Sequence, residues 1–320
     1  DEGSNIGLSL DSPVDPGSTV ETFTYAFDCG TGAGYGTPGA SNTASCSTDD
    51  DGGRTVKGKI IDSNGGFTVY QSTVTINDVK PTSVDAHGPY TVNSGAALTA
   101  LNGTYTCVSV DDCTTAWDLD GDGVFGEPAD NPASHTWYAA GDYTVTFRVT
   151  DNDGNAVSDT ATVHVTSVTH AITLQPGWNL VSFNLIPAGT SITQVLESVS
   201  GKYDLVYAWD AGTQTWKHYD PTSEPYQNTL LSALDNTMGF WIHLKDTEVS
   251  PVILSVTGSV PVSTTINLSA NGQGWNLVGY PAANNRALPG ALDGTNFRMT
   301  YAFHANDTAD PWKVYDTTSP

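Results

Sequence analysis

The sequence predicts a mainly all-β protein, with tandem antiparallel β-sandwiches followed by a repeated β-rich module that contains short helices. Motifs return at nearly constant spacing: Thr55–Asp62 is repeated at Thr144–Asp151, and Gly177–Val181 is repeated at Gly274–Val278. Between turn residues, β-branched segments alternate apolar and polar positions, as half-buried strands do. In 320 residues the chain therefore uses two module types twice. Such arrays usually build length and surface rather than one catalytic pocket.

The first module is expected over residues 1–78. Alternating, β-branched segments predict strands over Thr22–Phe27, Thr55–Ile61 and Phe67–Ile76. Between the last two lies Asp62–Gly66, which is rich in residues that tolerate positive φ and so predicts a hairpin turn.

The second module is expected over residues 81–166, after a short linker at Asn77–Pro81. Gly141–Thr150 alternates with a period of two, Asp151–Gly154 is the turn that follows, and a last strand over Ala161–Val165 closes the module. Short strands at this spacing favour an antiparallel β-sandwich of about 80 to 90 residues.

Four motifs of this second module occur in one order, at Tyr90–Asn93, Ala116–Gly123, His135–Val145 and Val149–Gly154. Together they resemble the PKD domain, an immunoglobulin-like sandwich found in cell-surface proteins and secreted hydrolases. The first module is similar but departs from the pattern, because it has Phe27-Asp-Cys-Gly in place of the Trp-Asp motif. The resemblance implies two tandem immunoglobulin-like sandwiches, the first of them divergent.

From about residue 170 the pattern changes to two copies of another module, expected over 170–250 and 251–320. Each copy is predicted to open with a strand at its Gly-Trp-Asn-Leu-Val motif. In the first copy, apolar residues at helical spacing predict a short helix over Ser191–Val199, and a helical turn is predicted over Leu230–Leu234. A hairpin over Leu205–Tyr219 and a last strand over Gly239–Leu244 are also expected. The module resembles repeats of large prokaryotic surface proteins, a resemblance that implies no activity.

The second copy has no counterpart of Pro225–Leu244, so we expect it to be incomplete at its C-terminus. One interpretation is that the sequence is a segment of a longer chain. The other is that a strand from a neighbouring subunit completes the sandwich, which would make the chain its own partner in head-to-tail assembly.

The charge is strongly acidic, with 35 Asp and Glu against 11 Lys and Arg, for a net charge of -24. Such a surface repels nucleic acid and anionic membranes, so we expect neither as a partner, and it attracts cations. No run of about 18 apolar residues is present, so no membrane insertion is expected of this sequence.

The four cysteines form two close pairs, each within one early module. Pairing of Cys29 with Cys46 and of Cys107 with Cys113 would give two disulfides and indicates an oxidising compartment, although four reduced core thiols remain an alternative. We therefore expect an extracellular or cell-surface location. Three sequons make glycosylation candidates of Asn102, Asn267 and Asn306.

The best candidate metal site is the segment Asp118-Leu-Asp-Gly-Asp-Gly, in which carboxylates alternate before a glycine. Asp118, Asp120 and Asp122 could wrap a hard cation such as Ca²⁺, and Glu127 and Asp130 could add oxygens. The alternative is a solvated acidic turn. Two other groups, at Asp49–Asp51 and at Asp151 with Asp153, are weaker candidates for a cation site, and the favoured interpretation is that they are turn formers and solvated charge.

Aromatic residues give a second candidate site. Trp178 recurs as Trp275 and Trp216 recurs as Trp312, which predicts that these four are core anchors of the repeated fold. A stripe that contacts glycans could be formed by the aromatics that remain, Tyr207, Trp209 and Tyr226.

Catalysis finds little support, because the sequence holds no HExxH, no GxSxG and no Gly-rich phosphate loop, and its seven histidines are scattered. We expect a non-catalytic extracellular structural protein, a modular segment of a prokaryotic cell-surface protein that acts in spacing, adhesion or self-assembly into a surface layer or filament. The alternative is an accessory region of a secreted hydrolase, binding polysaccharide or serving as a spacer.

Overall fold

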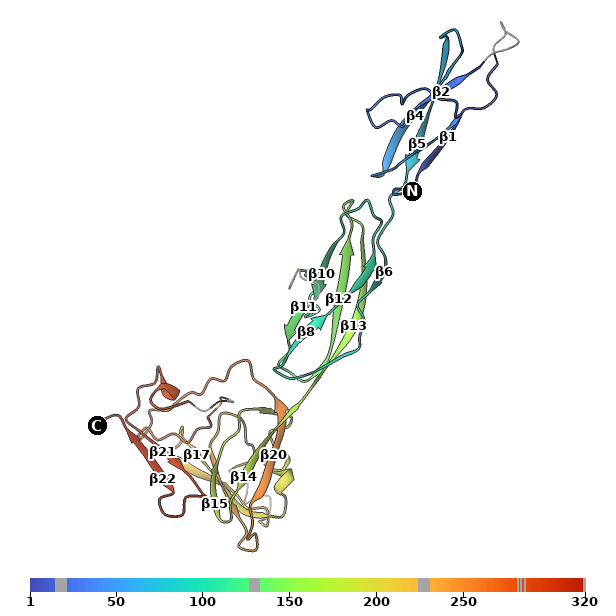
Figure 1. Cartoon of the computed structure of the whole chain (residues 1–320). Coiled ribbons are helices and arrows are strands. Elements are labelled where there is room, and N and C mark those ends of the chain that lie inside the picture. The colour runs from blue at the N-terminus through green and yellow to red at the C-terminus, as the bar shows by residue number, and fades with distance from the viewer. Residues whose placement is uncertain are drawn as a thin grey trace. The chain divides into compact units, whose positions relative to one another are not determined.

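The computed structural model describes residues 1–14, 22–126, 133–223, 231–280, 282, 284 and 286–318. Strands dominate, as Figure 1 shows, and the predicted all-β class is confirmed. The chain divides into two compact units. The first comprises Asp1–Pro89, Thr99–Ser134 and Tyr143–Thr162, and the second Tyr90–Leu98, His135–Asp142 and Val163–Pro320.

The first module consists of two small sheets in the first unit. β1 pairs with β3, and β2, β4 and β5 form an antiparallel sheet in that order. The strands are β1 (Ile6–Ser9), β2 (Thr24–Asp28), β3 (Thr43–Cys46), β4 (Gly52–Ile61) and β5 (Phe67–Ile76). The predicted turn between β4 and β5 is confirmed: Asp62 Oδ1 accepts the backbone N–H groups of Asn64 and Gly66, at 2.8 Å each.

The described residues of the segment predicted as the second sandwich, 81–126 and 133–166, form eight strands: β6 (Thr82–Asp85), β7 (Tyr90–Asn93), β8 (Ala97–Leu101), β9 (Thr104–Thr106), β10 (Thr114–Asp118), β11 (Ala133–Thr136), β12 (Gly141–Thr150) and β13 (Ala156–Thr166). The sheets are β10-β12-β13-β7, β11-β8 and β6-β9. One pairing departs from the antiparallel prediction, because β7 runs parallel to β13. Hydrophobic alternation shows which face of a strand is buried, but it does not reveal the partner's direction.

The core of this sandwich follows the alternation of β12, whose residues Val145, Phe147 and Val149 are fully buried. Phe147 packs on Trp117 of β10 with 4.9 Å between ring centroids. Gly103 also lies against this ring. A Cβ atom at residue 103 would stand 2.4 Å from two ring carbons of Phe147, so only glycine fits there.

The second unit holds the repeated module. Its elements are β14 (Val168–Leu174), β15 (Trp178–Val181), β16 (Ile186–Pro187), α1 (Ile192–Val195), η1 (Glu197–Val199), β17 (Tyr203–Asp210), β18 (Thr215–Tyr219), β19 (Phe240–Leu244), β20 (Val252–Ser259), η3 (Gly290–Leu292), β21 (Met299–Phe303) and β22 (Trp312–Asp316). The sheets are β14-β20-β16, β15-β19-β17-β18 and β21-β22. One core, which includes Phe183, Leu196 and Phe240, lies between the first two sheets and α1.

The short helix predicted over 191–199 is present as α1 and η1. Ser191 caps α1 by accepting the N–H of Gln194, and Ile192, Val195 and Val199 are buried on one face. The helical turn predicted over 230–234 is wrong within its described part, 231–234. There Ala233 bridges Ser191 in extended backbone, which places Leu231 and Leu234 in the core without a helix.

The strand β20 bears on the boundary between the two copies. It pairs with β14 over the length of both strands, and its Leu254 and Val256 belong to the first copy's core. We therefore propose that the first copy extends to Ser259 rather than ending at residue 250.

The opening strand predicted for the second copy is wrong. In the first copy β15 is held by β19, whereas in 274–278 only Val278 forms a bridge, with Met238. No second-copy strand occupies the place of β19 among the described residues, so the motif lacks the ladder that would hold it. The hairpin of β21 and β22 does reproduce that of β17 and β18, because Phe303 pairs with Trp312 as Trp209 pairs with Trp216.

Candidate functional site

Both predicted disulfides are present. Cys29–Cys46 joins β3 to the segment after β2, and Cys107–Cys113 closes a short loop before β10. The three sequon asparagines, Asn102, Asn267 and Asn306, are all exposed. Exposure is compatible with glycosylation, which stays a prediction.

The predicted acidic loop follows β10 and brings Asp118, Asp120 and Asp122 together. One oxygen from each lies within 4.8 Å of the others. Both oxygens of the buried Asp118 already accept backbone N–H groups, from Gly121 at 2.7 Å and Gly123 at 3.0 Å. The carboxylate thus closes its own turn, a geometry that suits a solvated turn as well as a Ca²⁺ loop. Glu127 and Asp130 lie outside the described residues.

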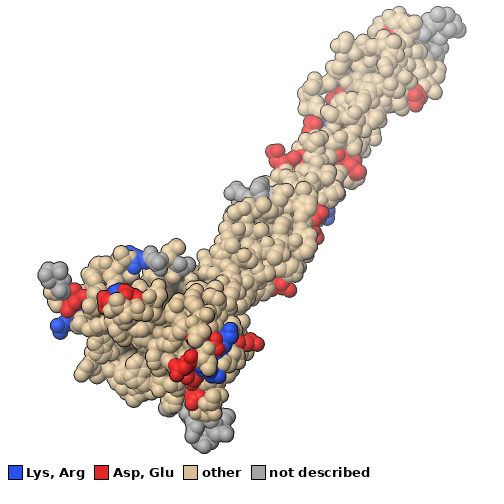
Figure 2. All heavy atoms as spheres, turned by 60° about the horizontal axis from the view of Figure 1, so that its bottom comes forward, with Lys and Arg blue, Asp and Glu red and all other residues tan. Residues whose placement is uncertain are grey.

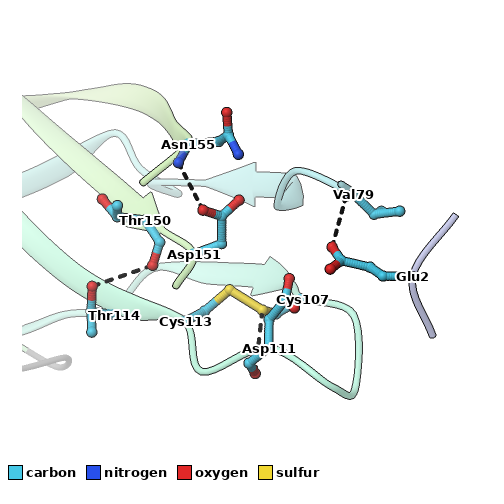
Figure 3. Close-up of a disulfide and its surroundings, with 9 residues drawn as sticks. All are labelled: Glu2, Val79, Cys107, Asp111, Cys113, Thr114, Thr150, Asp151 and Asn155. Atoms are coloured by element: carbon cyan, nitrogen blue, oxygen red, sulfur yellow. Dashed lines mark hydrogen bonds between the residues drawn. A yellow bond between two sulfur atoms is a disulfide. The ribbon is translucent and has the colours of Figure 1, made fainter. Parts of the chain in front are cut away.

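A second group of carboxylates lies where the first module, the linker and the second sandwich meet within the first unit. We call it the joint cluster: Glu2, Asp50, Asp51, Asp78, Asp111, Asp151 and Asp153. Figure 3 shows Glu2 beside Val79 of the linker, facing the loop that the Cys107–Cys113 disulfide closes. No member forms an ion pair with Lys, Arg or His in the described parts of the chain.

Glu2 holds the N-terminal segment in this joint. Its backbone N–H donates to the carbonyl of Asn77 at 3.0 Å, and its Oε1 accepts the N–H of Val79 at 2.8 Å. The side chain belongs to a residue that is only 1% exposed, and its second oxygen, Oε2, is buried without a partner. One carboxylate oxygen of Glu2 also lies within 4.8 Å of oxygens of Asp50 and Asp153.

The second sandwich contributes Asp111 and Asp151. Asp151, 5% exposed, uses Oδ1 to accept the N–H of Asn155 at 2.7 Å, while its Oδ2 is buried without a partner. Both side-chain oxygens of Asp111 are likewise buried without an N–H or O–H donor, and the carboxyl of Glu2 lies within hydrogen-bond reach of Asp111. Asn155 also reaches from this sandwich to the linker, where its side-chain amide donates to Asp78.

Three carboxyls of the joint cluster have raised pKa values. Burial raises the pKa of Asp111, and the Asp151, Asp153 and Asp78 carboxylates raise it further. Partial desolvation raises the pKa of Asp153, and Asp51 and Asp50 add to it. The hydrogen bond from Val79 lowers the pKa of Glu2, but burial and neighbouring carboxylates outweigh it, so the net shift is upward. Negative charge is therefore uncompensated here.

Sequence reasoning named two parts of the joint cluster, Asp49–Asp51 and Asp151 with Asp153, as weaker candidates, but it missed that they meet Glu2, Asp78 and Asp111. The one available signal was that the linker carries Asp78 between two modules, while Asp151 and Asp153 lie in a turn of the second. Their identification as turn formers is correct for Asp151, which accepts the N–H of Asn155. The expectation that the turn carboxylates are solvated is wrong for Asp151, because this residue is only 5% exposed and its Oδ2 is buried.

An aromatic face forms the third candidate site, on the outer side of the sheet β15-β19-β17-β18. Its members stand opposite one another across the strands: Trp178 with His243, Trp241 with Tyr207, Tyr207 with His218 and Trp209 with Trp216. The hairpin β21–β22 packs on this face, where Trp241 contacts Phe303 and Trp312 at centroid distances of 4.9 and 5.6 Å.

The prediction that the four repeated tryptophans are core anchors is wrong. Trp178, Trp216, Trp275 and Trp312 are between 39% and 50% exposed. Strand periodicity explains this, because Trp178 alternates with the buried Asn179 and lies opposite the core. Of the predicted glycan contacts, Tyr207 and Trp209 are half-buried in the aromatic face, and Tyr226 lies outside the described residues. Trp209 Nε1 donates to the carbonyl of Trp275 at 2.9 Å and so ties the two copies together.

On the face drawn in Figure 2, acidic side chains are far more frequent than basic ones. None of the helices in the described residues has the length and apolar character needed to cross a membrane.

Comparison with known proteins found a match of residues 86–165 to the family model of the PKD domain. A search of curated proteins gave no match. Among solved structures, the Clostridium thermocellum CbhA fibronectin(III)-like modules are 20% identical, with 51% of this chain and 86% of that chain covered and a TM-score of 0.24. Mouse Cadherin-23 EC22-24 is 16% identical, with coverage of 82% and 94% and a TM-score of 0.28. The human Desmocollin-1 ectodomain is 12% identical, with coverage of 83% and 60% and a TM-score of 0.21.

These TM-scores are too low to carry any argument about function. The family match is independent of them and falls on the residues where the four sequence motifs occur in order. Residues 86–165 of this chain are therefore a PKD domain, as the sequence predicts.

Proposed function

We propose that this chain is a non-catalytic structural segment of a prokaryotic cell-surface protein, acting in spacing, adhesion or self-assembly. The observation that carries the proposal is the construction of the chain: small β modules in series, one of them a PKD domain, with one disulfide in each of the first two. Disulfides persist in oxidising compartments, which supports an extracellular location.

The disulfides, the net charge and the acidic loop each suit a stable structural segment outside the cell. A disulfide limits the unfolded state of its own module, so each of the first two modules is stabilised individually against unfolding. A net charge of -24 favours solubility and attracts cations to the surface of the chain. Calcium at the Asp118–Asp122 loop remains part of the proposal, since bound Ca²⁺ would fix the end of β10.

Electron microscopy of the purified, oxidised chain tests the assembly role, with and without a calcium chelator. Ordered filaments or sheets are the expected result, and their loss on chelation would add Ca²⁺ to the mechanism. Separate particles that stay monomeric at high concentration, with and without Ca²⁺, would contradict self-assembly and leave spacing or adhesion.

A second candidate function is favoured by the aromatic face. Trp178, Trp216 and Trp312 each expose between 39% and 50% of their surface on one side of the second unit, and exposed indole rings can stack on sugars. Under this alternative the chain is a polysaccharide-binding accessory region of a secreted hydrolase. Glycan-array binding that is lost in Trp216→Ala and kept in Tyr70→Ala, an exposed aromatic of β5, would support it. An array on which the unaltered chain binds no glycan would contradict this alternative.

A further inference from the structure

The joint cluster carries negative charge that no neighbouring cationic side chain in the described residues compensates. Seven carboxyls of the first module, the linker and the second sandwich gather there, with no cationic side chain paired to any of them in the described residues. Desolvating a carboxylate without a compensating charge is costly, and groups in that position usually either take up protons or hold a metal ion.

The buried oxygens distinguish this group from an ordinary acidic surface patch. Glu2 is 1% exposed and Asp151 is 5% exposed. In each, one carboxylate oxygen accepts a backbone N–H and the other oxygen is buried without a partner. Both side-chain oxygens of Asp111 are also buried, and no N–H or O–H group donates to them. In the Asp118–Asp122 loop, by contrast, both oxygens of the buried Asp118 are satisfied by the backbone.

The geometry is already close to that of a ligand set. Oxygens of Glu2, Asp50 and Asp153 lie within 4.8 Å of one another, so a single ion between them could contact all three. The carboxyls of Asp78 and Asp111 also lie near this set, because both act electrostatically on Glu2. All the donors are hard oxygens, with no sulfur or imidazole among them, which selects Ca²⁺ or Mg²⁺ over softer transition metals.

We propose that the joint cluster is a Ca²⁺-binding site that locks the first module to the PKD domain. Calcium is favoured over Mg²⁺ because it accepts six to eight oxygen ligands in irregular geometry, whereas Mg²⁺ demands a small octahedron. Glu2, Asp50, Asp151 and Asp153 supply ligands from the two modules and Asp78 supplies one from the linker. The bound ion neutralises the carboxylates and holds the joint rigid.

The duplicated module offers a matched control. Asp62 and Asp151 occupy equivalent places in the repeat, after β4 and after β12, and each accepts the N–H four residues ahead. Replacing either by Asn keeps an oxygen that can accept this bond and removes only the charge. Asp151 belongs to the joint cluster and Asp62 does not, so the pair separates loss of a ligand from loss of a turn.

Calorimetric titration of the metal-free, full-length chain with CaCl₂ at pH 7 tests the proposal. We expect binding in the unaltered chain, affinity at least about tenfold weaker in Asp151→Asn and unchanged affinity in Asp62→Asn. In Asp120→Asn, any heat of Ca²⁺ binding to the Asp118–Asp122 loop is removed from the titration, and the joint site is unchanged. If Asp151→Asn does not fold, Asp153→Asn, which changes an exposed residue, replaces it.

A second readout follows the joint itself. Proteolysis within the linker 77–81 is expected to slow when Ca²⁺ is added to the unaltered chain or to Asp62→Asn, and the same protection of Asp151→Asn is expected to need at least about tenfold more Ca²⁺. Absence of binding up to about 10 mM Ca²⁺, beyond the range of extracellular modules, would overturn the proposal. Equal affinities in Asp151→Asn and Asp62→Asn would also overturn it. Neither measurement depends on filaments or sheets, so failure here leaves the proposed surface role untouched.

Discussion

Gly103→Ala provides the most direct test of how the PKD core is packed. The added methyl group would stand 2.4 Å from Cδ1 and Cε1 of Phe147, where carbon atoms ordinarily approach to about 3.5 to 4.0 Å. One of the two groups must move by more than about 1 Å. Phe147 is fully buried against Trp117, also fully buried, at a centroid distance of 4.9 Å, so the ring has little room to yield.

Overpacking of this kind costs about 1 to 3 kcal/mol, and the rigid surroundings place the substitution near the upper end. For a domain of this size, each 1 kcal/mol lowers the melting temperature by about 4 to 8 °C. We therefore expect the PKD transition of Gly103→Ala to fall by at least about 10 °C. Gly53→Ala is the control, because Gly53 is an exposed residue near the beginning of β4 and its new methyl meets nothing within 4 Å.

The assay is thermal unfolding by calorimetry, combined with a double-mutant cycle. Phe147→Leu removes the ring carbons that cause the clash, so the double variant should be less destabilised than the sum of the two single variants by at least about 1 kcal/mol. Gly103→Ala within about 0.5 kcal/mol of the unaltered chain would refute this account of the packing, as would strictly additive effects in the cycle.

Two further predictions concern covalent and ionic contacts. Replacing Cys29 and Cys46 together by serine opens a loop whose ends are 17 residues apart, and chain entropy predicts a loss of about 3 kcal/mol, measured by denaturant titration of the first module. The pKa of Asp210 is lowered to about 2, first by its hydrogen bond with Lys217 and then by the backbone N–H of Thr213. Because the folded-state pKa is depressed, this stabilisation is full above the ordinary pKa of 3.8 and is lost as the pH falls towards 2. The stability difference between the unaltered chain and Asp210→Asn should shrink over that pH window, and a difference that does not change with pH would contradict the assignment.

Local patterns predicted the elements of this fold well where one strand or turn carries its own signal. Alternation located β12 and β5, and turn residues located the hairpin at Asp62. Ser191 and the apolar residues that follow it predicted α1, whose cap depends only on neighbouring residues. Each of these features is specified within about ten residues, which is the distance over which periodicity and capping act.

Long-range pairing was beyond the reach of the same patterns. The parallel pairing of β7 with β13 joins residues more than seventy positions apart, and the place of β20 in the first copy depends on β14. The second Gly-Trp-Asn-Leu-Val motif shows the limit most clearly. In the first copy four of the five motif residues form the strand Trp178–Val181, whereas in the second copy the motif forms only an isolated bridge at Val278, because a strand requires a partner as well as a propensity.

The repeated tryptophans were misjudged for a related reason. Recurrence at matching positions indicates that a residue has the same role in both copies, but it does not say which side of the sheet it occupies. Trp178 and Trp216 lie on the outer face, where the second copy packs against the first through Trp241, Phe303 and Trp312. The aromatic residues therefore join two copies instead of filling the core of either.

The equivalent aspartates of the two sandwiches show how an array can gain a site that neither module contains. Asp62 and Asp151 close the same kind of turn with the same oxygen, and sequence repetition accounts for both. What differs is the neighbour: Asp151 lies where Glu2 and Asp78 arrive from the first module and the linker, and it is buried there. A turn former is thereby left with one free buried oxygen among other carboxylates. Because each contribution is locally ordinary, the site is visible only once the modules are brought together, and we expect its concentrated negative charge to make their junction respond to cations.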